Sequence, residues 1–165
     1  MESNSITAIE KSSDASGWKE TNIAVGKGPE GIDISPDDKE VWAANSGDGT
    51  VSIIEIATGK VIHTIDARTK HSNRLKFTPD GKFALISDPE TGELVIGDTV
   101  TRTITKMLAV GRGPGGILMV PDGSRAYVAL AGENAVAVID LRTLEVSDKI
   151  PTGQGPDGLA WVVRP

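Results

Sequence analysis

The chain alternates between short apolar runs and turns that are rich in glycine, proline and aspartate. The apolar runs are rich in β-branched residues, and no segment places apolar residues at the spacing of roughly 3.6 residues that marks an amphipathic helix. Between Gly116 and Thr152 this pattern predicts four strands, at residues 117–120, 126–130, 135–140 and 146–150. We therefore expect an all-β protein.

The strand pattern repeats along the chain with a period of about 42 residues. Pro-Asp turns begin at Pro36, Pro79 and Pro121, which are 43 and 42 residues apart. In two repeats the turn reads Pro-Asp-Gly, where proline presets φ and glycine takes the left-handed position that closes a hairpin. The first repeat has Asp38 in place of that glycine, and we expect Asp38 to adopt the left-handed conformation less readily.

Repeats of this length with four antiparallel strands are typical of β-propeller blades, which stand radially around a central channel. The sequence therefore predicts a single β-propeller segment over residues 1–165, with three complete four-stranded antiparallel blades and partial blades at both termini. The complete blades are expected at 26–67, 68–110 and 111–152, the last two strands of a partial blade at 4–25, and the first strand of a further blade at 153–165.

The two partial blades leave three arrangements open. If both ends met in one ring, the composite blade would lack its second strand, and backbone groups inside the sheet would be unpaired. This argues against a closed four-bladed monomer. The chain can instead be the C-terminal half of a larger propeller, or two copies can complete one ring as a homodimer.

Further motifs accompany the Pro-Asp turns. They are Ser35-Pro36-Asp37, Val41-Trp42-Ala43-Ala44-Asn45, Tyr127-Val128-Ala129, Val136-Ala137-Val138-Ile139-Asp140 and Thr58-Gly59-Lys60. Together they resemble the YVTN-type β-propeller repeats of bacterial and archaeal surface-layer and secreted proteins. This resemblance covers most of the chain. It implies a propeller of about seven blades, of which this chain would be the C-terminal half, and an extracellular or periplasmic location for the full-length protein.

The composition excludes several kinds of site. The formal net charge is −6 and the sequence pI is near 4.9, so attraction to nucleic acid is not expected. There is no cysteine and there are only two histidines, so we predict no metal and no cofactor. The sequence shows neither a signal peptide nor an apolar run long enough to span a membrane.

The second repeat departs from the others at its opening. The first and third repeats open with Gly-x-Gly-Pro, whereas the second has the longer stretch Arg68-Thr69-Lys70-His71-Ser72-Asn73-Arg74. In a propeller this loop shares a face with the loops that join second and third strands. Arg112, in the opening of the third repeat, is expected on the same face. Arg68, Lys70, His71, Arg74 and Arg112 are therefore candidate ligands for a carboxylate, a phosphate or an acidic partner segment. A degenerate repeat with a solvated loop would explain the same residues.

Asp33 and Lys76 take the same position in two successive innermost strands and carry opposite charges. They are expected to face the channel, either as a ligand-holding pair or as an ordinary salt bridge. Two further positions recur with the repeat. They are occupied by Trp42, Leu85 and Tyr127, and by Ile34, Phe77, Met119 and Trp161. We expect both sets to pack between neighbouring blades.

These observations favour a non-enzymatic scaffold that binds a protein, a ligand or a cell-surface component through its loop face. The alternative is a segment of a propeller enzyme, lactonase-like or of the quinoprotein or d1-haem type, whose site is completed by blades outside this chain. No Ser/His/Asp arrangement for nucleophilic catalysis can be assembled from the sequence, and we name no catalytic residue. Fold alone does not decide between the two hypotheses.

Overall fold

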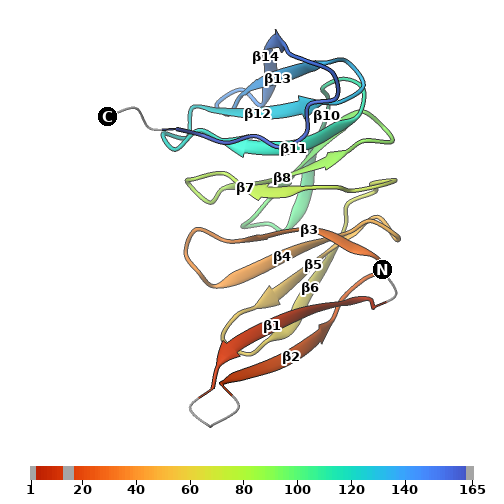
Figure 1. The fold of residues 1–165 in the computed structure, drawn as a ribbon. Coiled ribbons are helices and arrows are strands. Elements are labelled where there is room, and N and C mark those ends of the chain that lie inside the picture. The colour runs from red at the N-terminus through yellow and green to blue at the C-terminus, as the bar shows by residue number, and fades with distance from the viewer. Residues whose placement is uncertain (1–2, 13–16, 163–165) are drawn as a thin grey trace.

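The computed structural model describes residues 3–12 and 17–162, and every regular element in them is a β-strand (Figure 1). The strands form a two-stranded sheet followed by three four-stranded sheets, all antiparallel. The two-stranded sheet contains β1 (Ser5–Lys11) and β2 (Trp18–Ala24). The prediction of an all-β chain built from four-stranded antiparallel blades is confirmed.

Each four-stranded sheet is one blade, and its strands follow one another in chain order from the inner to the outer edge (Figure 1). The first blade holds β3 (Pro29–Ile34), β4 (Glu40–Asn45), β5 (Thr50–Glu55) and β6 (Lys60–Asp66). The second holds β7 (Leu75–Phe77), β8 (Phe83–Asp88), β9 (Glu93–Asp98) and β10 (Thr103–Ala109). The third holds β11 (Pro114–Met119), β12 (Arg125–Leu130), β13 (Ala135–Asp140) and β14 (Glu145–Pro151).

The Pro-Asp turns join the first and second strands of each blade as expected. Gly81 and Gly123 both have φ of 72°, and Asp38 has φ of 57°, so all three occupy the left-handed region. Asp38 therefore adopts a conformation that costs an L-residue about 1 kcal/mol relative to glycine. In the first turn the Asp37 carboxylate accepts a hydrogen bond from the Lys39 N–H (3.2 Å), which explains the aspartate without a metal.

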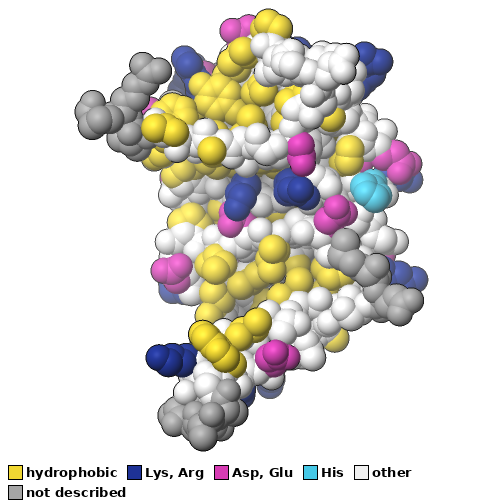
Figure 2. Space-filling model, viewed as in Figure 1, with side chains coloured by type: hydrophobic (Ala, Val, Ile, Leu, Met, Phe, Trp, Pro, Cys, Tyr) yellow, Lys and Arg dark blue, Asp and Glu magenta, His cyan; other side chains and the backbone are white. Residues whose placement is uncertain are grey.

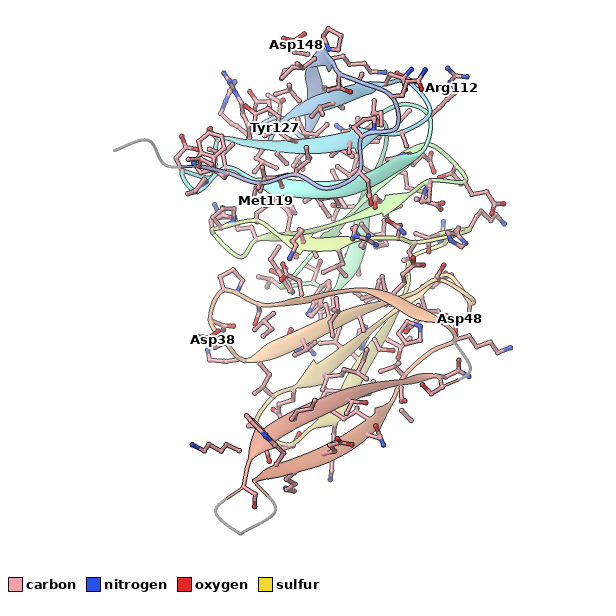
Figure 3. The ribbon with its side chains drawn as sticks, in the orientation of Figure 1. Asp38, Asp48, Arg112, Met119, Tyr127 and Asp148 are labelled. Carbon is pink, nitrogen blue, oxygen red and sulfur yellow. The ribbon has the colours of Figure 1, made fainter. Side chains whose placement is uncertain are left out.

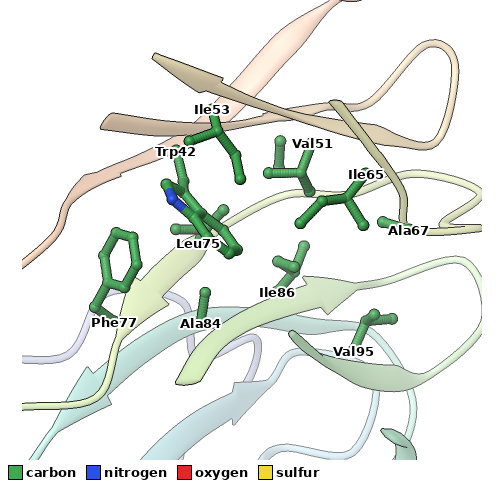
Figure 4. Packing of buried hydrophobic residues seen from close by; sticks show 11 residues of the cluster. Trp42, Val51, Ile53, Ile65, Ala67, Leu75, Phe77, Ala84, Ile86 and Val95 are labelled. Atoms are coloured by element: carbon green, nitrogen blue, oxygen red, sulfur yellow. The ribbon is translucent and has the colours of Figure 1, made fainter. Parts of the chain in front are cut away.

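The hydrophobic core lies between the blades rather than within any one of them (Figure 4). Trp42 on β4 is fully buried and meets Phe77 on β7 edge to face, with ring centroids 5.3 Å apart. The next junction repeats this arrangement, since Leu85 on β8 and Met119 on β11 belong to one cluster. A second-strand residue of one blade therefore covers an inner-strand residue of the next blade, as the recurring positions predicted.

The C-terminal segment differs from the prediction. Residues 159–162 are not a β-strand, although the segment lies where an inner strand would lie. The Asp157 carbonyl passes so close to Gly116 that a Cβ there would be 2.0 Å away, and Trp161 stacks on Tyr127 at 6.5 Å. A strand needs a hydrogen-bonded neighbour, and among the described residues no second strand lies beside this segment. The remaining part of the prediction, residues 163–165, falls outside the described residues.

Candidate functional site

The loops that enter the first strand of each blade lie beside those that join its second and third strands. In the third blade, the Ala131 N–H donates to the Gly113 carbonyl (3.1 Å) across these two loops. Figure 3 shows Asp48 and Arg112 at this end of the blades and Asp38, in a Pro-Asp turn, at the opposite end. We call the first end the loop face and the second the turn face.

The 68–74 loop on the loop face is anchored by Asp88, the last residue of β8. The Asp88 side chain is buried and accepts hydrogen bonds from the backbone N–H groups of Lys70 (2.6 Å) and His71 (3.2 Å). It also accepts two from backbone N–H groups in the β8–β9 loop. Asp88 binds the backbone of the loop and not its side chains, and the side chains of Lys70 and His71 are exposed. The loop is therefore fixed in shape while it displays positive charge.

The sequence interpretation did not single out Asp88. Its equivalent in the first blade is Asn45, also buried, whose side-chain amide donates to the hydroxyls of Thr50 (2.9 Å) and Ser52 (3.0 Å). The sequence signal for Asp88 is a polar residue at the end of an otherwise apolar strand. Its role as an anchor depends on the 68–74 loop, which lies next to it only in the folded chain.

Two residues of the loop reach across to the first blade at Glu30. The Asn73 side-chain amide donates to Glu30 Oε1 (2.8 Å), and His71 Nε2 lies 3.8 Å from Glu30 Oε2. The Glu30 carboxylate thus ties the loop to β3. His71 has one carboxylate beside it, and no group of three or more His, Cys, Asp and Glu side chains suited to a metal occurs within residues 3–12 and 17–162.

Asp33 and Lys76 form the pair that their shared position predicted. Lys76 Nζ lies 3.1 Å from Asp33 Oδ1, and the Phe77 N–H donates to Asp33 Oδ2 (3.0 Å). Asp33 therefore joins β3 to β7 through both a side chain and the backbone. These contacts give Asp33 a structural role at the junction of the two blades, whether or not a ligand binds there.

Arg74 stands where the neighbouring blades have a glycine. Its equivalents are Gly31 and Gly116, and a Cβ on Gly31 would lie 2.7 Å from the Leu75 nitrogen. Arg74 itself is exposed, and its guanidinium donates to the Asn73 carbonyl (3.3 Å). No ion pair of Arg74 occurs among the described residues. This guanidinium is therefore available to an anionic group.

The five basic candidates on the loop face do not form one cluster. Arg68 lies toward the outer edge of the blades, in a groove of about 450 Å³ between β6 and β10. Arg112 stands on the third blade, where its N–H donates to Glu133 Oε1 (2.9 Å). By contrast, Arg74 and Lys76 lie at the start of β7 and on the strand itself, close along the chain to Lys70 and His71.

Hydrogen bonds lower the pKa values of several carboxyl groups on both faces. On the loop face, the Lys149 side chain and then the Arg112 backbone hold the pKa of Glu133 below its usual range. On the turn face, the Ser35 hydroxyl and Lys39 lower the pKa of Asp37 to about 2. Both groups are stabilised as carboxylates by their neighbours, which fits roles in holding loops and turns.

Solved structures of known proteins share this architecture. The chain is 31% identical to Kuenenia stuttgartiensis hydrazine synthase, with a TM-score of 0.74, over 78% of this chain and 37% of that one. It is 20% identical to a candidate 6-phosphogluconolactonase from Bacteroides uniformis, with a TM-score of 0.76, over 93% of this chain and 50% of that one. A functionally unknown protein from Desulfotomaculum acetoxidans is 15% identical, with a TM-score of 0.77, over 93% and 51% of the two chains.

The chain thus spans between about a third and a half of the length of these structures. No curated protein matches it. The choice-of-anchor I domain matches residues 5–155, which points to a protein of the cell surface or a secreted one. None of the described segments is a helix that could cross a membrane. Since the match covers most of its length, the chain belongs to the choice-of-anchor I domain family.

Proposed function

We propose that this chain is a non-enzymatic β-propeller scaffold that binds an anionic partner through its loop face. The observation that carries the proposal is the 68–74 loop, whose backbone is held by the buried Asp88 while Lys70 and His71 remain exposed. A loop fixed before binding loses little conformational entropy when a partner arrives. The exposed Lys70 ammonium, together with the Arg74 guanidinium, suits carboxylate or phosphate groups.

The partner is proposed to be a protein or a cell-surface component that carries clustered carboxylates or phosphates. Family membership supports a place at the cell surface or outside it, and we extend this to an extracellular or periplasmic site of action with surface-layer-like, YVTN-type repeats. Because the net charge of the whole chain is −6, binding would depend on this local group of cations rather than on general attraction.

An enzyme segment, lactonase-like or of the quinoprotein or d1-haem type, is the weaker alternative. The channel residues that could take part are Asp33 and Lys76, and these already satisfy each other and the Phe77 N–H. The lactonase-like structure from Bacteroides uniformis shares only 20% identity with this chain, so its name does not support the same activity here. The exposed loop therefore supports binding better than catalysis.

The proposal is tested with fluorescein-labelled polyglutamate as the anionic probe. Binding to the whole chain is measured by fluorescence anisotropy at two salt concentrations. The double variant Lys70→Ala/Arg74→Ala should bind at least about tenfold more weakly, since each charge-assisted contact is worth about 1 kcal/mol or more. Asp88→Asn, which keeps every cation but disturbs the loop backbone, should weaken binding severalfold.

The matched control is Lys60→Ala/Lys82→Ala, which removes the same charge from exposed residues at the opposite end of the blades. Equal losses in the control and in the Lys70/Arg74 variant would show that only net charge matters, and they would overturn the assignment to the loop face. Unchanged binding in the Lys70/Arg74 variant would do the same.

A further inference from the structure

A groove of about 450 Å³ lies between residues 63–66 of β6 and residues 103–107 of β10. These are the outermost strands of the first and second blades, and both blades have all four strands. Figure 2 shows the side of the inner strands, where Lys and Arg side chains lie among Asp and Glu side chains. The groove lies at the opposite edge of the sheets, away from this side.

The next blade junction shows how the same space can be closed. Lys106 and Leu144, one repeat further along the chain, are the equivalents of His63 and Arg102. Lys106 Nζ reaches from β10 to the third blade and donates to the Leu144 carbonyl (2.6 Å). The Leu144 side chain packs against the core cluster between these two blades. A lysine and a leucine therefore fill and bridge the outer part of this junction.

Neither contact occurs between the first and second blades. The Arg102 guanidinium turns away to form an ion pair with Glu40 on β4. His63 is exposed, and within residues 3–12 and 17–162 it forms no hydrogen bond or ion pair. The groove is therefore open because its two residues differ from those that close the next junction.

The floor of the groove is apolar. Ile65 is 5% exposed, and Ile104 packs against the core cluster between the first and second blades. Met107 also lines the groove and is 41% exposed. A large apolar side chain placed here would remove Met107 from water and gain contacts with both isoleucines.

The charged residues along the groove are mostly basic, although the chain as a whole carries a net charge of −6. Arg68, Arg102 and Lys106 line it together with the carboxylate of Asp66. Arg68 and Asp66 pair only loosely, at 3.9 Å, with side chains that are 79% and 76% exposed. A carboxylate that enters the groove can therefore bind the Arg68 guanidinium at little cost.

We propose that this groove, which we call the rim groove, binds an extended segment of a partner protein in which large apolar side chains alternate with carboxylates. An apolar side chain rests on Ile65, Ile104 and Met107, and a neighbouring carboxylate meets Arg68. The four residues 63–66 span about 10 Å at roughly 3.3 Å per residue. The rim groove therefore accommodates about four residues of an extended segment.

A peptide fits the rim groove better than a small carboxylic acid does. Residues 63–66 pair regularly with β5 on one side and with no described strand on the other. Their outward backbone groups can bind a peptide backbone, which a small acid lacks. The site is also separate from the loop face, since neither Lys70 nor Arg74 lines it.

The probe for the test is the fluorescein-labelled peptide Asp-Leu-Asp-Leu-Asp, and its matched control is Asp-Ser-Asp-Ser-Asp, which has the same charge. Each peptide is titrated with the whole chain and followed by fluorescence anisotropy. We expect the leucine peptide to bind saturably and at least about tenfold more tightly, because a leucine side chain is buried. Equal affinities, or no binding at millimolar leucine peptide, would overturn the proposal.

A variant that closes the rim groove locates the site. His63→Lys/Arg102→Leu installs the residues of the next junction and leaves the formal net charge unchanged, with histidine counted as neutral. It should fold like the wild type by circular dichroism, because Lys106 and Leu144 already occupy these positions in the repeat. It should bind the leucine peptide at least about tenfold more weakly. Wild-type affinity would overturn the proposal.

Two further variants complete the test. Met107→Glu should also weaken binding at least about tenfold. Ile150→Glu makes a matched change at a similarly exposed residue on β14, 44% against 41%, and should bind like the wild type. Equal losses in these two variants, or a loss in Lys70→Ala/Arg74→Ala, would place the peptide elsewhere and overturn the proposal. The loop-face proposal is tested with another probe, so the two can fail separately.

Discussion

Replacement of Trp42 by alanine should destabilise the protein more than the same truncation of Leu85 or Tyr127, which occupy the equivalent position in the other two blades. Trp42 is fully buried, meets Phe77 at 5.3 Å, and donates from Nε1 to Glu40 Oε2 (2.8 Å). The side chain therefore fills the junction between the first and second blades and is also held by a hydrogen bond within β4. Its removal leaves a cavity between two sheets that cannot collapse without moving whole strands.

The magnitude follows from these contacts. Truncation of a buried tryptophan to alanine costs about 3–5 kcal/mol. Loss of the indole donor adds at most about 1 kcal/mol, because Glu40 also accepts from the Arg102 guanidinium. We expect a total near 4 kcal/mol, which is a large part of the 5–15 kcal/mol that stabilises a typical domain. Tyr127→Ala, at the equivalent but half-exposed position beside Trp161, should cost about 1–2 kcal/mol.

Urea unfolding followed by far-ultraviolet circular dichroism measures both variants. With a slope of about 2 kcal/mol per molar urea, Trp42→Ala should lower the midpoint by about 2 M and Tyr127→Ala by less than about 1 M. Trp42→Phe should fall between the wild type and Trp42→Ala. A loss below about 1 kcal/mol for Trp42→Ala, or a loss equal to that of Tyr127→Ala, would refute the view that the blade junctions form the core.

Two further predictions concern the backbone and the turns. Gly31→Ala should destabilise the chain by about 1–3 kcal/mol, because its Cβ would lie 2.7 Å from the Leu75 nitrogen, whereas Gly153→Ala, with open space around it, should be neutral in the same urea assay. Asp37 has its pKa lowered to about 2 by the Ser35 hydroxyl and Lys39. Its stabilising effect is therefore complete above the unfolded value near 4 and is lost as the pH falls toward about 2. Asp37→Asn should flatten acid unfolding in this range, and an unchanged acid transition would contradict the assignment.

Much of the fold could be predicted because each repeat carries the same local sequence features, namely Pro-Asp turns and short apolar strands. The Pro-Asp turns fix where hairpins form, and the strands predicted at 126–130 and 135–140 appear as β12 and β13 within one residue at each end. The segment 159–162 was predicted as a strand, yet a strand also requires a hydrogen-bonded neighbour, and among residues 3–12 and 17–162 no second strand lies beside it.

The candidate site was less accessible to sequence reasoning. Spacing predicted the Asp33–Lys76 pair, because equivalent residues of successive inner strands must face each other. The 68–74 loop was found by its departure from the repeat, but sequence could not show that Arg68 and Arg74 lie toward opposite edges of a blade. It also could not show that Asp88 anchors the loop, since this depends on how a loop and a distant strand end meet in space.

Trp42 contacts Phe77, Leu85 and Met119 share one cluster, and Tyr127 stacks on Trp161. Among the described residues, each blade therefore packs against the blades next to it along the chain. The free energy of unfolding of such an array is approximately the sum of the stabilities of the blades and of the interfaces between neighbouring blades, as in linear repeat proteins. Amide exchange should accordingly be slowest in β8 and β9, which have a blade on either side, and should quicken toward the N-terminal hairpin, where fraying begins.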